Sequence, residues 1–80
     1  MKCYERTNTE LKKIAQSALQ FEYGFAPKLK EIVLLEASGD GTYILFEVNR
    51  VEYCFESSMK GVADIPKDCK WLTIGTIEKR

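Results

Sequence analysis

Two glutamates, Glu47 and Glu52, are the residues of this 80-residue chain best placed for acid–base chemistry, because they lie close together in a region of alternating apolar and polar residues. Paired carboxylates act as acid and base when a substrate cleft holds one of them neutral. The chain contains no histidine, so the commonest general base and the Ser–His and Cys–His nucleophile pairs are missing. The sequence therefore favours a protein that is not an enzyme, with both glutamates at a surface or a partner contact.

The cysteines and glycines form no metal or cofactor motif. Cys3, Cys54 and Cys69 are far apart in the sequence, whereas zinc ligands come in closely spaced pairs. The turn Gly39-Asp40-Gly41 lacks the Lys-Ser/Thr of a P-loop and the third glycine of a dinucleotide fingerprint. We predict no metal and no cofactor, and free thiols in a reducing compartment rather than a disulfide framework.

The charges balance, with 12 Lys and Arg against 12 Asp and Glu and a calculated isoelectric point of about 6.3. Nucleic-acid-binding proteins usually carry a basic surplus, because neutralising phosphates supplies much of their affinity, so the composition argues against nucleic acid as the main partner. No apolar run is longer than Ile32–Leu35, and the first residues carry no apolar signal core. We therefore expect no membrane segment and a cytoplasmic location.

One amphipathic helix is predicted near the N-terminus. Thr7 and Glu10 have the spacing of a capping box at its start, and Gly24 followed by Pro27 ends it. Glu22 falls near the middle of the apolar stripe, and we expect the last turn to fray so that its carboxylate reaches solvent. The apolar stripe consists of Leu11, Ile14, Ala15 and Ala18, with Leu19 and Phe21 at its edges.

After Pro27 the pattern indicates β-strands, because branched and aromatic residues begin to alternate with polar ones. Residues 57–69 mix Ser, Gly, Pro and charge and are predicted to form a loop, and Gly75 is a predicted bulge or point of close approach. The four predicted strands are Ile32–Leu35, Thr42–Val48, Val51–Phe55 and Trp71–Ile77.

Asn49-Arg50 has the length of a two-residue hairpin turn, which places Glu47 directly opposite Glu52. One face of this hairpin is wholly apolar and must meet the helix; it carries Ile44, Phe46, Val48, Val51, Tyr53 and Phe55. The opposite face is part apolar and part acidic. With the first strand joined to it, that second face carries Val33, Leu35, Tyr43, Leu45, Glu47, Glu52, Cys54 and Glu56.

The predicted fold is a single α+β domain over residues 1–80, with one N-terminal helix packed on a three- to four-stranded antiparallel sheet in the order α-β-β-β-β. One helix covers one face of a sheet, so the second face is expected to be exposed. Apolar anchors inside a polar rim are typical of protein interfaces. The sequence therefore favours a small protein-interaction module whose partner-binding residues are Val33, Leu35, Tyr43, Leu45, Glu47, Glu52 and Glu56.

The partner of this face is expected to be a protein with a basic surface or a second copy of the chain in a homodimer. An inhibitor or accessory protein of bacterial, phage or mobile-element origin is one concrete form of this hypothesis, with a nucleic-acid-handling protein as its target. The alternative hypothesis is a small nucleotide- or nucleic-acid-binding protein that uses exposed aromatic residues together with Lys60, Lys67 and Lys70.

Overall fold

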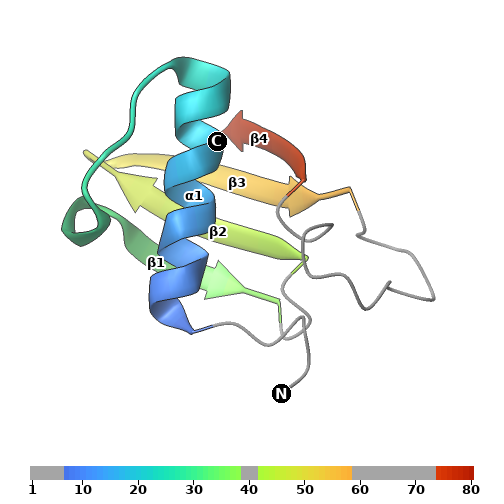
Figure 1. Ribbon diagram of the computed structural model, residues 1–80. Coiled ribbons are helices and arrows are strands. Elements are labelled where there is room, and N and C mark those ends of the chain that lie inside the picture. Colours follow the sequence, from blue (N-terminus) through green and yellow to red (C-terminus); the bar gives the residue numbers. More distant parts are fainter. Residues whose placement is uncertain (1–6, 39–41, 59–73) are drawn as a thin grey trace.

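The computed structural model describes residues 7–38, 42–58 and 74–80. In these ranges the chain forms one α-helix, a short 3-10 helix at Leu29–Glu31 and one antiparallel sheet with the strand order β1-β2-β3-β4 (Figure 1). The predicted α+β fold with the element order α-β-β-β-β is confirmed. The bounds are α1 at Asn8–Tyr23, β1 at Val33–Ala37, β2 at Tyr43–Val48, β3 at Val51–Ser57 and β4 at Gly75–Lys79.

The two ends of α1 follow the predicted capping signals. The backbone N–H of Glu10 donates to Oγ1 of Thr7 over 3.2 Å, and the backbone N–H of Thr7 donates to Oε1 of Glu10 over 3.1 Å. At the other end Gly24 has a φ of 77°, in the left-handed region that glycine adopts without steric cost, and its N–H donates to the carbonyl of Gln20. The capping box and the glycine stop are both confirmed.

All four strands have different bounds from those predicted, although β2 differs only in beginning at Tyr43 instead of Thr42. The strand predicted at Ile32–Leu35 is β1 at Val33–Ala37, and β3 continues past Phe55 to Ser57. The strand predicted at Trp71–Ile77 is β4 at Gly75–Lys79, while residues 71–73 and most of the predicted loop lie outside the described residues. The reason is that pairing with a neighbour decides where a strand ends: β4 continues to Lys79 because that residue lies opposite Tyr53.

Gly75 is a point of close approach, as predicted. A Cβ atom at this position would overlap the carbonyl oxygen of Glu56 and would lie 2.7 Å from the Cα atom of Ser57. Real Cβ atoms essentially never come this close to backbone, so β4 can begin here against β3 only because the residue has no side chain.

The hairpin between β2 and β3 has the predicted register. Asn49 and Arg50 have φ values of 51° and 66°, so both central residues of the turn are in the left-handed region, as a type I′ turn requires. Val48 then pairs with Val51, and Glu47 pairs with Glu52. The side chains of each pair point to the same face of the sheet, so this turn decides which residues face α1.

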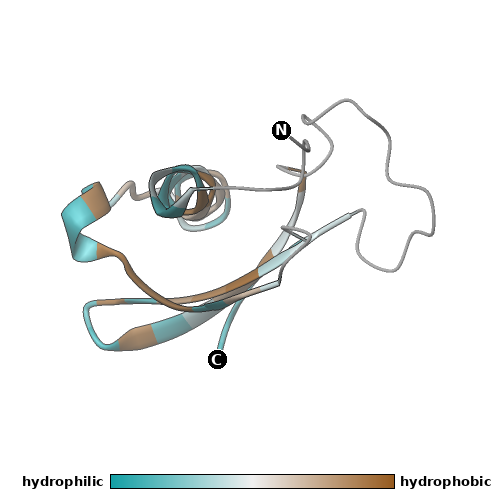
Figure 2. Cartoon of the chain, turned by 90° about the horizontal axis from the view of Figure 1, so that it is seen from below, coloured by the Kyte–Doolittle hydropathy of each residue, from teal (hydrophilic) through white to brown (hydrophobic). Residues whose placement is uncertain are grey.

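The inner face of the sheet is the one that α1 covers, and Figure 2 shows the helix nearly end-on beside the curved strands. The aromatic rings of Phe46 and Tyr53 stack in this layer with their centroids 5.5 Å apart. No helix in the described part of the chain has the length and apolarity needed to cross a membrane. The core consists of Leu11, Ile14, Ala15, Leu19, Ile32, Ile44, Phe46, Val48, Tyr53, Phe55 and Ile77.

The end of α1 differs from prediction in the exposure of one residue and in the regularity of the last turn. Phe21, expected at the edge of the buried stripe, is 89% exposed, because its side chain borders an open groove between α1 and β4. Glu22 is exposed as expected, but α1 does not fray, since it stays helical to Tyr23. The carboxylate of Glu22 is accessible because the groove is open there.

Candidate functional site

The outer face of the sheet is the face that points away from α1. In antiparallel strands, residues directly opposite each other point to the same side, so the register identifies the residues on this face. Val33 pairs with Glu47, Glu47 pairs with Glu52, and Tyr43 pairs with Glu56. None of the described elements covers this side of the sheet (Figure 2). All seven residues predicted to bind a partner are described, and the strands place them on this one face.

A β-bulge in β1 changes how the first strand contributes to the outer face. Leu34 pairs with Phe46 and Glu36 pairs with Leu45, so Leu35 is an extra residue between two ladder positions. Without the bulge, strict alternation would point Glu36 toward the helix. The bulge instead turns Glu36 outward, and Leu35 stays on the outer face beside Leu45.

The centre of the outer face is apolar. Val33 and Leu35 are 53% and 47% exposed, and Tyr43 and Leu45 are half-buried between neighbouring side chains. An open hollow of about 530 Å³ lies over this part of the sheet. The residues that line it include Leu35, Leu45, Glu36, Glu52 and Arg80.

The apolar centre lies among carboxylates. Glu78 in β4 pairs with Cys54 and therefore also points outward. In the described strands no lysine or arginine points to this face, because Lys79 pairs with the inner-face residue Tyr53. Arg80, which follows β4, is the described cation that lines the hollow over this face, and its backbone N–H donates to the carbonyl of Glu52 over 2.8 Å. The outward glutamates are Glu36, Glu47, Glu52, Glu56 and Glu78.

Sequence reasoning found three of these five glutamates and missed Glu36 and Glu78. Alternation alone places Glu36 on the inner face, and no residue in β1 signals the bulge. Glu78 was missed because the last strand was predicted to end at Ile77. The alternation of apolar Ile77 with charged Glu78 was the available signal, since a residue next to a core position in a strand points to the opposite face.

The structure describes only part of the alternative hypothesis, namely the aromatic residues of the hairpin, of which Tyr43 lies partly accessible on the outer face. Lys60, Lys67 and Lys70 lie outside the described residues. Phe46, Tyr53 and Phe55, the regular aromatic positions of the hairpin, are buried under α1 and cannot stack on a base. Among the residues that the structure describes, no group of three or more His, Cys, Asp or Glu side chains is arranged to hold a metal ion.

No protein-family model, no curated protein and no solved structure shows a significant match to this chain.

Proposed function

We propose that this chain is a protein-interaction module that binds the basic surface of a partner protein through the outer face of its sheet. The observation that carries this proposal is the group of five outward glutamates around Val33, Leu35 and Leu45 on a face that no described element covers. Apolar anchors supply most of the binding free energy of an interface, and complementary charge supplies specificity and a fast association rate.

The charge of the outer face favours a different protein over a second copy. Two copies meeting through this face would bring Glu47 and Glu52 of one against the glutamates of the other. Like charges brought together in an interface cost several kcal/mol, whereas a lysine- or arginine-rich partner would pair with them. A symmetric dimer through the outer face, which the sequence left open, is therefore the weaker form of the proposal.

A nucleic-acid-handling protein is the class of partner that best fits an acidic face, because its own binding surface is rich in lysine and arginine. A chain that occupies such a surface excludes the nucleic acid, so inhibition is the effect we propose. The outward glutamates would repel phosphates, and so the alternative of direct nucleic-acid binding has less support. The proposal requires no catalytic step and no cofactor.

Affinity capture with matched variants tests this proposal. The Glu47→Gln/Glu52→Gln variant removes two negative charges from the outer face and leaves side-chain size almost unchanged. The control, Thr9→Lys/Gln20→Lys, changes the net charge by the same amount at exposed positions of α1. We expect the wild type and the control to retain the same protein at low salt and to lose it at high salt, and the glutamine variant to retain much less.

Two results would contradict the proposal. If the glutamine variant and the wild type retained equal amounts of the partner, the charges of Glu47 and Glu52 would have no role in binding. Capture of nucleic acid alone, lost at high salt, would instead support the alternative hypothesis. If a partner is retained, adding nucleic acid to the complex should release it, because both ligands would need the same basic surface.

A further inference from the structure

The strand β4 forms one edge of the sheet. The strand order β1-β2-β3-β4 gives β4 a described neighbour on one side only, and its register with β3 is regular from Gly75 to Lys79. The opposite edge strand, β1, is interrupted by its bulge, and a bulge is one way in which proteins keep an edge from pairing with another strand. Of the two edges, β4 therefore has the geometry that suits pairing.

The hydrogen bonds at the two ends of β4 show which of its backbone groups point away from the sheet. The N–H of Ser58 donates to the carbonyl of Ile74 over 2.7 Å, and the N–H of Arg80 donates to the carbonyl of Glu52 over 2.8 Å. Successive residues of an antiparallel strand direct their backbone groups to alternate sides, so the even-numbered residues of 74–80 bond to β3. The residues whose N–H and C=O groups point outward, where no described residue pairs with them, are Gly75, Ile77 and Lys79.

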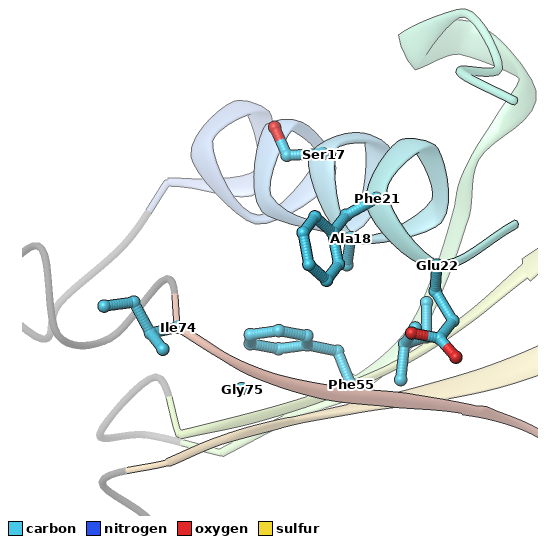
Figure 3. A pocket seen from close by; sticks show the side chains of 8 residues that line it. Ser17, Ala18, Phe21, Glu22, Phe55, Ile74 and Gly75 are labelled. Atoms are coloured by element: carbon cyan, nitrogen blue, oxygen red, sulfur yellow. The ribbon is translucent and has the colours of Figure 1, made fainter. Parts of the chain in front are cut away.

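An apolar groove runs beside this edge, between the last turns of α1 and β4, with a volume of about 340 Å³. Figure 3 shows the ring of Phe21 projecting from α1 toward the sheet, above the start of β4. Phe21 is 89% exposed and Ile74 is 53% exposed, whereas Phe55 and Ile77, which also line the groove, are buried in the core. A strand added to β4 would therefore cover apolar side chains as well as pair the backbone.

We propose that β4 pairs antiparallel with β4 of a second copy, so that the two sheets join into one continuous sheet. A row of outward N–H and C=O groups is matched by another extended strand, because such a strand offers acceptors and donors at the same spacing. A two-fold axis at Ile77 places this residue opposite Ile77 of the second copy and Gly75 opposite Lys79. All three outward residues of each copy are then paired.

The sequence of β4 is complementary to itself in this register. Thr76 lies opposite Glu78 of the second copy, and Lys79 lies opposite Gly75, where no side chain competes for the space. Moving the axis one residue toward the C-terminus would place Glu78 opposite Glu78, which is unfavourable. Moving it one residue the other way would leave Lys79 opposite a residue beyond the strand. The register that pairs the most residues therefore brings no like charges directly opposite each other.

The same symmetry covers the groove. Residues directly opposite each other point to the same side of a sheet, so the two copies place α1 on the same side of the joined sheet. The two grooves then face each other across the axis, and Phe21 of each copy is covered by the other. The outer face stays uncovered in this dimer, so the arrangement does not depend on the partner-binding role of that face.

Sedimentation equilibrium up to millimolar concentration, combined with hydrogen exchange, tests this proposal. We expect a reversible dimer with a micromolar dissociation constant, because the interface is small. The amides of Ile77 and Lys79 should exchange slowly only at concentrations where the dimer forms. The amides of Thr76 and Glu78 should be protected at every concentration, because they bond to β3.

Three results would overturn the proposal. A monomer whose Ile77 and Lys79 amides always exchange fast would mean that the edge stays open, and a monomer whose amides there always exchange slowly would mean that the protein's own chain covers it. A dimer that leaves these two amides unprotected would mean that the copies meet elsewhere.

Substitutions separate the backbone contacts from the side-chain contacts. Lys79→Pro removes an outward N–H and leaves the pairing with β3, a position at which edge strands tolerate proline. It should weaken dimerisation about tenfold or more, whereas Lys79→Ala, its matched control, keeps the N–H and should keep the dimer. Equal effects of these two variants would show that the backbone of β4 is not used.

Phe21→Ala tests the covered groove and remains decisive if Lys79→Pro fails to fold, because Phe21 is exposed in the single copy. It should weaken dimerisation about tenfold, as for an aromatic residue at the centre of an interface. Leu35→Ala removes apolar area at the opposite edge of the sheet and should leave the dimer unchanged. A thermal melt of each variant checks that it folds. If Phe21→Ala had no effect, the proposed register would be wrong.

Salt distinguishes this dimer from the proposed partner binding. Backbone and apolar contacts are hardly screened, so added salt should leave dimerisation unchanged or strengthen it, whereas capture of a basic partner should be lost. The Glu47→Gln/Glu52→Gln variant should dimerise at least as well as the wild type. Weaker dimerisation of that variant would contradict the edge dimer, and unchanged partner capture by it would contradict only the role of the outer face.

Discussion

The two faces of the sheet are built from the same strands and have opposite properties. Along β2, Ile44 and Phe46 point inward and are fully buried under α1, while Leu45 and Glu47 point outward and stay partly accessible. The inner face carries apolar side chains almost throughout, whereas the outer face places Glu47 directly opposite Glu52. The strand geometry is shared, so the difference comes from side chains alone.

This difference shows which face of the sheet stabilises the fold. Burial of the inner face supplies the hydrophobic free energy of folding, and changing it should unfold the protein. Two like charges paired across the outer face oppose folding by up to about 1 kcal/mol. Residues that break a local rule without stabilising the fold are the expected signature of a functional surface, and Glu47 with Glu52 fits that description.

The largest expected difference between the faces is in adjacent residues of β2. Ile44→Ala should lower the free energy of unfolding by about 2–5 kcal/mol, because it leaves a cavity in the core. Leu45→Ala, one residue further along on the outer face, should lower it by about 1 kcal/mol or less. Urea unfolding followed by circular dichroism measures both. Equal losses would mean that the outer face is also part of the folding core.

Gly75→Ala tests whether β4 can pair with β3 only when residue 75 has no side chain. The added Cβ would overlap the carbonyl of Glu56, so β4 must shift, at a cost of about 1–3 kcal/mol. Thermal unfolding gives the loss, and hydrogen exchange should show it concentrated in the amides of β4. Gly24→Ala is the control, because its Cβ would meet nothing within 4 Å and only its left-handed φ opposes the change. A neutral Gly75→Ala would show that β4 has room to move.

Arg50→Gly tests the turn that sets the register of β2 and β3 and so determines on which face of the sheet each residue lies. Arg50 has a φ of 66°, a conformation that costs a residue with a side chain about 1–2 kcal/mol and costs glycine little. Because glycine also loses more entropy on folding, the net gain should be up to about 1 kcal/mol, seen as a higher urea midpoint. A loss of stability would mean that the arginine side chain contributes contacts that outweigh the strain. Asn49→Gly should change less, because asparagine tolerates this region.

The smallest expected effect on stability comes from replacing one glutamate of the like-charge pair Glu47 and Glu52. Glu52→Lys should raise the free energy of unfolding by about 0.2–1 kcal/mol, because a lysine then lies opposite Glu47. The gain should shrink as salt is added. In the double variant Glu47→Lys/Glu52→Lys the two lysines again repel each other, so its gain should be smaller than the sum of the single gains. Additive gains would show that these two positions do not interact.

Local signals in the sequence were sufficient to predict the helix and the central hairpin. Thr7 with Glu10 and Gly24 mark the ends of α1 through interactions within a few residues. The two-residue turn at Asn49-Arg50 sets the pairing of Glu47 with Glu52, since the register of a hairpin follows from its turn. Three of the five outward glutamates follow from that register without any knowledge of the other strands.

The remaining parts of both sites depend on contacts between distant segments. Glu36 faces outward because β1 forms a bulge against β2, and Glu78 joins the outer face because β4 continues beside Cys54. The groove at Phe21 and Glu22 exists because the end of α1 lies above β4, from a segment more than fifty residues later in the chain.

By itself, the sequence determined the helix, the central hairpin and the separation of apolar from acidic side chains, because capping, turn geometry and alternation act over a few residues. The tertiary structure alone decided the bulge in β1, the extent of β4 and the groove beside α1, because strand ends and surface hollows depend on which distant segments pair. The outer face depends on both, since the hairpin supplies three of its glutamates and half of its apolar centre, while β1 and β4 supply Glu36, Glu78 and the remaining apolar residues.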